Sequence, residues 1–391
     1  NGKGWFLSDP SDITSRVAAL GQSPRPAVVG SPSSVSMNKE RSYIDGVKGF
    51  SDNVNVRARL TFTLPERASV PSVPDERYLS LTVTYVLARL PQQPMEPRLD
   101  DDRIGYFTTT QYDPGSRTQD AYVRTINRWR LSPSRPLTYY IDGSVPTEYR
   151  RFVETGVQAW GRAFAAAGWP QAIRVEPLPK GADPEDIRYP TIRWDSSVDA
   201  PLGRGESLID PRSGEILGAS ILISSHLIRH HQRVHLPLVV DRMPASAWGR
   251  MLWTHTLRQP AFIDRPASEF RGDLDPPALR PDIDLGDDGL HFSLNLRSQA
   301  ILLRSALIAS GSVLSQEATP ERILGQSIVF CAMHEVGHTL GLRHNFKSSS
   351  AVPNDRLADM AWVRQHGLTA SVMDYPGLNL PHGKAPPDWL Y

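Results

Sequence analysis

The sequence predicts an α+β protein, in which an antiparallel β region precedes a larger region of mixed strands and helices. Two stretches in the first hundred residues, 54–64 and 79–87, alternate apolar and polar side chains with period two. Farther along the chain, short apolar segments surround two long helical segments. Period two is typical of strands with one buried face, and the order strand, helix, several strands, helix is typical of α+β folds.

We expect three parts in the chain. Residues 1–100 would form an antiparallel β domain, because a proline-rich connection joins the two alternating stretches. Residues 101–135 would form a linker, and residues 136–391 would form the second, larger domain. Within that domain we interpret 225–319 as an insertion, because it separates the last strand from the second long helix. We expect the C-terminal part of this domain to be cut short.

The elements of the larger domain follow in order. A short apolar strand is expected at Leu137–Ile141, and Ser144 is a candidate N-cap for a helix that runs to about Ala167. A second long helix is expected to start at Thr319-Pro320, where an N-cap residue precedes a proline at the first helical position. Between the helices we expect strands at Ile173–Val175, Thr191–Trp194, Gly203–Ile209 and Ile216–Ile223, the last two joined by a hairpin turn at 210–214.

Charge and composition exclude several classes of protein. The 43 basic and 42 acidic residues give a net charge of +1, so there is no general electrostatic case for nucleic acid or an anionic membrane as partner. No uninterrupted apolar stretch is long enough to be a transmembrane segment. The single cysteine, Cys331, excludes an internal disulfide and is interpreted as a small buried side chain. The oligomeric state stays open.

The second helix ends in the motif His334-Glu-Val-Gly-His338-Thr-Leu-Gly341-Leu-Arg-His344. Two histidines four residues apart lie about 40° apart around a helix and one turn along it, so both imidazoles can reach one ion. Gly341 can take a left-handed conformation that ends the helix and turns His344 back as a third ligand. Three neutral nitrogen donors with an open fourth position are typical of catalytic rather than structural zinc. The motif therefore predicts one catalytic Zn²⁺.

Glu335 stands next to the first ligand, where a carboxylate can act on a water without itself binding the metal. This arrangement predicts metal-assisted hydrolysis, with Glu335 as the general base. The alternative from another class is a catalytically silent binding protein that keeps the scaffold. The presence of Glu335 argues against it, because metal binding alone does not need that carboxylate. Within enzymes, hydrolysis of another amide is the alternative to peptide hydrolysis.

The long histidine motif, together with the later segment Ser371-Val-Met373-Asp-Tyr375, resembles the metzincin zinc metalloproteases. In that clan a tight turn with methionine forms a hydrophobic floor beneath the zinc-bound histidines, and Met373 matches it. The gluzincin alternative needs a downstream glutamate as third ligand, and none follows Glu335. The resemblance implies a mixed twisted sheet with two long helices, endopeptidase activity, and a peptide or protein substrate.

The pairing of His344-Asn-Phe with Ser-Val-Met-Asp-Tyr-Pro is closest to the large bacterial zinc-dependent metalloproteases, whose N-terminal domains have no described function. That resemblance implies export to the periplasm or outside the cell. It also implies an edge strand that aligns substrate, which we assign to Gly203–Ile209. In some metzincins a tyrosine two residues after the turn methionine binds the developing oxyanion. Tyr375 stands in that position, and a buried tyrosine that packs under the turn is the other interpretation.

Two further clusters carry weaker signals. A group of histidines lacks acidic or cysteine partners at a recognisable spacing, so a solvated segment is favoured over a second metal site. An acidic run could hold Ca²⁺, but position 293, where an EF-hand loop would place glutamate, is serine, which favours a solvated loop. These clusters are His226, His230, His231 and His235, and Asp282, Asp284, Asp287 and Asp288.

Overall fold

The computed structural model describes residues 5–6, 36–64, 77–113, 115, 121–196, 203–225, 320–357 and 359–376. The predicted insertion beyond Ser225, with its histidine cluster and its acidic run, lies outside the described residues, and so do residues 377–391. The described chain combines helices and sheets, as expected for an α+β protein. It divides into two compact units, which are Asn1–Trp194 with Gly205–Leu222 and Ala332–Asn345, and Asp195–Arg204 with Ile223–Cys331 and Phe346–Tyr391.

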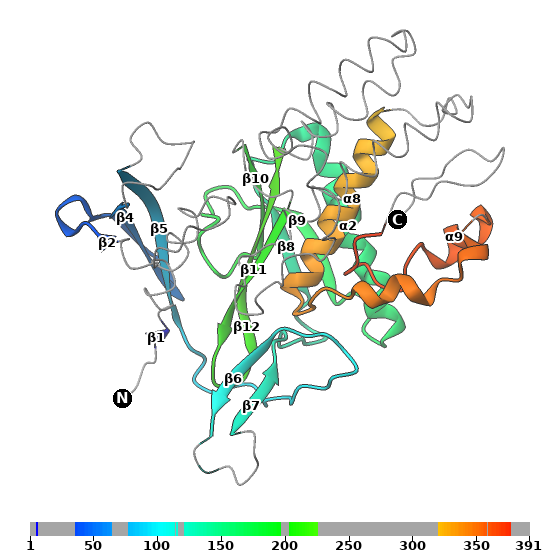
Figure 1. The fold of residues 1–391 in the computed structure, drawn as a ribbon, viewed down its shortest axis with the longest axis horizontal. Coiled ribbons are helices and arrows are strands. Elements are labelled where there is room, and N and C mark those ends of the chain that lie inside the picture. Colours follow the sequence, from blue (N-terminus) through cyan, green and yellow to red (C-terminus); the bar gives the residue numbers. More distant parts are fainter. Residues whose placement is uncertain are drawn as a thin grey trace, which may run out of the picture. The chain divides into compact units, whose positions relative to one another are not determined.

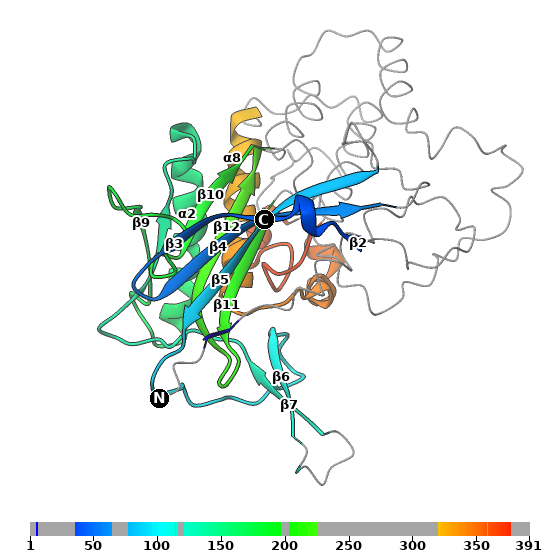
Figure 2. The ribbon, with the colours of Figure 1, turned by 90° about the vertical axis from the view of Figure 1, so that its left-hand side faces the viewer.

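The first sheet is built on the two alternating stretches. They form the strands β4 (Asn53–Thr63) and β5 (Tyr78–Arg89), which pair antiparallel along their whole length. Both predicted strands are therefore confirmed, and Figure 2 shows them side by side with β3. The remaining elements of this region are β1 (Trp5–Phe6), β2 (Ser36–Met37), the short helix η1 (Lys39–Arg41) and β3 (Tyr43–Gly49). The strand order is β1-β5-β4-β2, with β3 also on β4.

The burial of β4 differs from the simple period-two expectation. At its start the buried side chains are Asn53 and Asn55, whereas the apolar neighbour Val54 is only partly buried. Both asparagine amides donate to the carbonyl oxygen of Glu185, over 3.0 and 3.2 Å, and Asn53 Oδ1 accepts from the backbone N–H of Ile187 at 3.2 Å. Buried polar groups need such partners. The strand is therefore joined to the 183–190 loop by polar contacts.

The range 101–135, which we expected to be a linker, contains a β-hairpin. Its strands are β6 (Thr108–Tyr112) and β7 (Tyr122–Ile126), which pair antiparallel. They form a two-stranded sheet of their own, drawn in cyan in Figure 1. The described residues of this range therefore include two paired strands, and some of them take part in the site described below.

The second sheet contains all five strands that the sequence predicted in the larger domain. They are β8 (Leu137–Ile141), β9 (Ile173–Pro177), β10 (Thr191–Asp195), β11 (Gly203–Asp210) and β12 (Glu215–Ser224). Their order is β11-β12-β10-β8-β9, and β8 pairs parallel with both of its neighbours. A four-residue connection joins β11 to β12, which only antiparallel neighbours allow. The strand β11 lies at the edge of the sheet, as expected for Gly203–Ile209.

Two long helices accompany this sheet (Figure 1). The helix α2 (Thr147–Ala166) begins after Pro146 and has no side-chain cap. Ser144 is therefore not its N-cap, because its hydroxyl accepts a hydrogen bond from the backbone N–H of Trp194 instead. The helix α8 (Pro320–Thr339) begins at the predicted proline. Trp160 of α2 donates its indole N–H to the carbonyl of Met333 in α8, over 2.9 Å.

The C-terminal half of α8 is buried on all sides, since ten of the twelve residues from Ile328 to Thr339 are buried, Cys331 among them. Such a helix must find internal partners for its polar groups.

No helix that the structure describes is long and apolar enough to cross a membrane. The remaining described helices are η3 (Phe346–Ala351), η4 (Asn354–Arg356) and α9 (Met360–His366).

The hairpin turn between β11 and β12 contains a buried ion pair. Asp210 is fully buried, and Arg212 donates to it through its backbone N–H at 2.9 Å, Nε at 3.0 Å and Nη2 at 2.7 Å. Burial by itself would raise the pKa of the Asp210 carboxyl, but the hydrogen bonds from Arg212 outweigh it and lower this pKa.

This pair makes the hairpin sensitive to acid. Because the pKa of Asp210 is lower in the folded chain, its carboxylate stabilises the fold above the unfolded pKa of about 4, and this contribution is lost as pH falls through the folded pKa. We expect the Tm of Asp210→Asn to decrease less than the Tm of the wild-type chain when the pH is lowered from about 5 to about 3. The exposed Asp102→Asn is the control. Equal acid sensitivity of all three proteins would contradict this prediction.

Candidate metal centre

The structure brings the three predicted ligands together. His334, His338 and His344 each offer one ring nitrogen, and these three nitrogens all lie within 4.8 Å of one another. His334 Nε2 and His344 Nε2 are 3.0 Å apart. Two nitrogens bound to a tetrahedral zinc, each at about 2.0–2.1 Å, would be about 3.3 Å apart. The group therefore fits a single ion of the size and coordination of zinc after only a small adjustment.

The orientation of His338 is set by the chain itself. Its Nδ1 lies 2.9 Å from the carbonyl oxygen of Leu342. A carbonyl can only accept, so Nδ1 carries the proton and Nε2 keeps its lone pair for a metal. Such a backbone partner is the usual way in which a ligand histidine is held in the right tautomer and ring orientation.

The helix ends immediately after these ligands, at Gly341. The N–H of Leu342 donates to the carbonyl of Gly337 at 3.0 Å, and the N–H of Gly341 donates to that of His338 at 2.9 Å. This pair of bonds is the Schellman motif, with glycine in the left-handed position at φ +100°. A Cβ on Gly341 would also collide with the carbonyl oxygen of Asn127. Glycine is thus required both by backbone conformation and by space.

The segment that leads to His344 is held by residues of the predicted linker. Phe107 N–H donates to the Gly341 carbonyl at 2.7 Å, and Arg343 N–H donates to the Gly105 carbonyl at 2.9 Å. The ring of Phe107 also lies 5.7 Å from the ring of His338, measured between centroids. The third ligand is therefore positioned by a strand-like pairing with residues 105–107, and not by the glycine turn alone.

A buried hydrogen-bond network fixes the last turn of α8. Trp129 donates its indole N–H to the carbonyl of Thr339 at 2.7 Å, and the Thr339 hydroxyl donates to the Val336 carbonyl at 2.9 Å. Tyr139 of β8 lies 2.8 Å from the same hydroxyl, so it donates to that oxygen. Burial raises the pKa of the Tyr139 phenol, which keeps its proton in place. No local sequence pattern indicates the roles of Trp129 and Tyr139.

Glu335 is buried beside the first ligand, with 8 % of its surface exposed. The edge strand β11 passes close to it, because a Cβ on Gly205 would lie 2.5 Å from the Glu335 carbonyl oxygen. The glycine allows the strand backbone to approach the helix turn that bears this carboxylate. The structure therefore brings the backbone of β11 against the backbone of the helix turn that contains Glu335.

The methionine turn lies in the second unit. Met373 is buried, with 2 % of its surface exposed, and its N–H donates to the Ser371 hydroxyl at 3.1 Å. The ring of Tyr375 is 5.5 Å from that of Phe346. A tight turn is therefore present at this place, and its methionine side chain is buried.

Asp374 fastens this turn to the residues that follow the third ligand. Its Oδ2 accepts from the Ser348 hydroxyl at 2.8 Å, from the Ser349 N–H at 2.9 Å and from the Thr369 hydroxyl at 3.0 Å. Its Oδ1 accepts from the N–H of Tyr375 at 2.8 Å. With these four bonds the buried carboxylate is well satisfied. The turn is thus held by hydrogen bonds to residues 348, 349 and 369.

Comparison with known families agrees with this geometry. Residues 316–386 match a family model described as Met-zincin. This part of the chain is similar to the metzincins. The match spans all of α8, all three histidines and the methionine turn. A second model, a domain of unknown function, matches residues 13–134 and so includes the strands β2 to β5 of the first sheet and the β6–β7 hairpin. Among curated proteins and among solved structures, none matches the chain.

Two glycines with positive φ allow the steric crowding at the end of α8 to be tested. Gly341 and Gly168 have φ of +100° and +84°, but only a Cβ on Gly341 would meet other atoms within 4 Å. We expect Gly168→Ala to lower the free energy of unfolding by about 1–2 kcal/mol, from left-handed strain alone. Gly341→Ala should cost at least about 3 kcal/mol, because the clash adds to that strain. Urea unfolding measures both changes. Equal losses would show that the Asn127 contact is not limiting.

Proposed function

We propose that the chain is a zinc-dependent endopeptidase, with His334, His338 and His344 as metal ligands and Glu335 as general base. The observation that carries this proposal is the convergence of three imidazoles on one point, with a buried carboxylate next to the first of them. The Met-zincin match supports it independently. Three nitrogen donors leave one coordination position for water or substrate, as in catalytic zinc sites.

In the proposed mechanism, bound zinc would lower the pKa of a water and polarise the scissile carbonyl. Glu335 accepts the proton of the attacking water and then delivers it to the leaving amine, so one carboxylate serves as base and acid in turn. The backbone of β11 aligns the peptide as an added strand at the edge of the sheet. Its closeness to the Glu335 turn supports this assignment.

The remaining assignments of the proposal follow the family resemblance. Met373 would form the floor beneath the ligands, and Tyr375 would donate a hydrogen bond to the developing oxyanion. We propose that residues 1–100 form an accessory β domain and that residues 136–391 carry the catalysis. We also propose that the protein is exported, as in the large bacterial metalloproteases that it resembles.

The proposal is tested first through the ligands and the base. We expect about one zinc per wild-type chain by elemental analysis, and its loss in His338→Ala, because two ligands rarely hold zinc against a chelator. Glu335→Gln keeps the shape of the side chain, so it should retain zinc. The rate at which it cleaves a denatured proteome should fall by at least about 100-fold. The exposed Glu148→Gln is the matched control and should behave as wild type.

The outcomes of this test separate the parts of the proposal. Wild-type protein without a stoichiometric transition metal would overturn the metal centre. Zinc retention with wild-type turnover in Glu335→Gln would give the role of base to another residue. Zinc binding without any chelator-sensitive peptide cleavage would favour a silent metzincin scaffold.

The role of Tyr375 is tested with Tyr375→Phe, which keeps the ring and removes only the hydroxyl. If the phenol donates to the oxyanion, kcat falls by about 10- to 1000-fold while KM changes little. The exposed Tyr112→Phe is the control for loss of a phenol elsewhere. A zinc-loaded Tyr375→Phe with kcat within about twofold of wild type, and only a lower Tm, would assign Tyr375 to packing against Phe346.

A further inference from the structure

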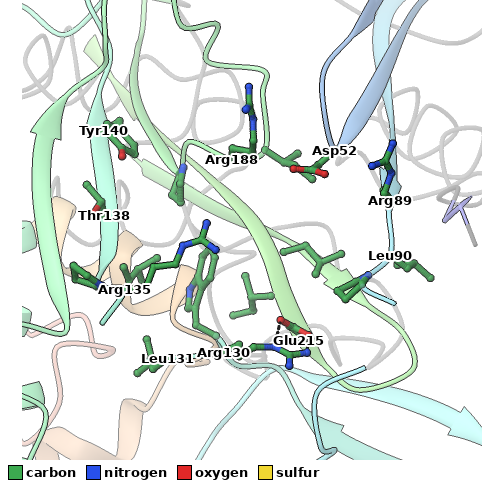
Figure 3. A pocket seen from close by; sticks show the side chains of 18 of the residues that line it. Asp52, Arg89, Leu90, Arg130, Leu131, Arg135, Thr138, Tyr140, Arg188 and Glu215 are labelled. Carbon is green, nitrogen blue, oxygen red and sulfur yellow. Dashed lines mark hydrogen bonds and ion pairs between the residues drawn. The ribbon is translucent and has the colours of Figure 1, made fainter. Parts of the chain in front are cut away.

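A second cavity lies within the first unit, away from the three histidines. Its volume is about 670 Å³. It is bounded by the end of the first sheet, by the chain that enters β8, by the loop at 187–190 and by the start of β12. Figure 3 shows its lining, with Asp52 and Arg89 on one side and Thr138 and Tyr140 on the other. None of the proposed catalytic residues lines it.

The cavity opens on the face of the second sheet that is opposite the metal centre. Successive side chains of a strand point to opposite faces. Tyr139 points toward α8, as its bond to Thr339 shows, whereas its neighbours Thr138 and Tyr140 line the cavity. In the parallel pair of β8 and β9, Arg174 is the register partner of Thr138, and it lines the cavity too. None of the three histidines lines the cavity, and Trp129 is the lining residue that also donates to the Thr339 carbonyl at the end of α8.

The charge of the lining is strongly positive. Five arginines face only two carboxylates, and the set is Arg89, Arg130, Arg135, Arg174 and Arg188 against Asp52 and Glu215. Two of the arginines are already paired, Arg130 with Glu215 at 2.6 Å and Arg188 with Asp186 at 2.5 Å. The other three make no side-chain hydrogen bond or ion pair with any residue that the structure describes. A cleft lined by one sign of charge concentrates ions of the opposite sign.

Much of the rest of the lining is apolar or aromatic. It includes Leu90, Leu131, Trp129, Tyr140 and Ile187. A ligand that suits both parts of the surface carries an anionic group for the guanidinium forks and an apolar body for the walls. Carboxylate and phosphate both match the planar guanidinium, which can bind either of them through two parallel hydrogen bonds.

We propose that this arginine-lined cavity is a binding site for a small organic anion. A carboxylate or phosphate group is held by Arg135 and Arg174, and the apolar part of the molecule lies against Tyr140 and its neighbours. The site is separate from the proposed peptidase centre, so ligand binding does not depend on the metal.

The test is calorimetric titration of the full chain with four probes. Phenyl phosphate and phenylacetate carry the two anionic groups on an apolar body, inorganic phosphate lacks the body, and benzyl alcohol lacks the charge. We expect one of the first two to bind with a Kd below about 1 mM, and inorganic phosphate and benzyl alcohol to bind at least about tenfold more weakly. Whichever of the two binds more tightly identifies the anionic group that the site prefers.

Variants locate the binding. The double variant Arg135→Gln/Arg174→Gln should weaken the tighter probe by at least about tenfold, since each substitution removes a charge-assisted bond. Arg162→Gln, an exposed arginine of α2 outside the cavity, is the control and should leave Kd within about twofold. The arginines are exposed, so the variants should keep the wild-type fold, which circular dichroism checks.

The same titration of His338→Ala separates this site from the metal centre, because anions can also bind a protein-held metal. Binding that persists in His338→Ala and falls in the double variant supports the arginine-lined cavity, whatever becomes of the peptidase proposal. The proposal is overturned if no probe binds, if the double variant binds as tightly as wild type, or if binding disappears with the metal ligand.

Discussion

The reversal of the chain at Gly341 is the constraint on which the metal centre depends. Residues four apart on a helix can present two histidines to one ion, and here the third histidine comes from the chain that doubles back directly after the helix. The positive φ of Gly341 permits this reversal, and the Asn127 carbonyl occupies the space where a Cβ would stand. Because only glycine meets both conditions, the helix must end at this residue. The position of this end then sets the distances among the three imidazoles.

Burial of the helix end explains why so much of the chain surrounds it. The last carbonyls of a helix have no partner within it, and an unpaired carbonyl away from water is costly. Trp129 satisfies the carbonyl of Thr339, and residues 105–107 pair with 341–343. These contacts come from a region that precedes the helix by some two hundred residues in the chain. They also hold the ligands rigidly, so little reorganisation is needed when a metal binds.

The two faces of the second sheet carry different features of the first unit. On one face lie the helix end and Glu335, approached by the glycine of β11, and the other face carries the arginine-lined cavity. The first sheet contributes to the second of these faces through Arg89, and it is joined to the same region through Asn53 and Asn55. Polar contacts of this kind are directional, so they set the position of the first sheet more sharply than apolar packing would. They also explain why an asparagine face is buried there.

The sequence by itself indicated the three histidines that converge, the glutamate beside them, the glycine turn and nearly all the strands. Each depends on residues close together in the chain: a helical repeat, a period of two, or a hairpin. It did not reveal that 101–135 supports the third ligand, that Asn53 and Asn55 are buried, or that Ser144 serves β10 rather than α2. Trp129 and Tyr139 carry no local pattern, since their partner Thr339 is about 200 residues away. Only the tertiary structure decided these roles, because hydrogen bonds between distant segments depend on where the folded backbone brings a donor within about 3 Å of an acceptor.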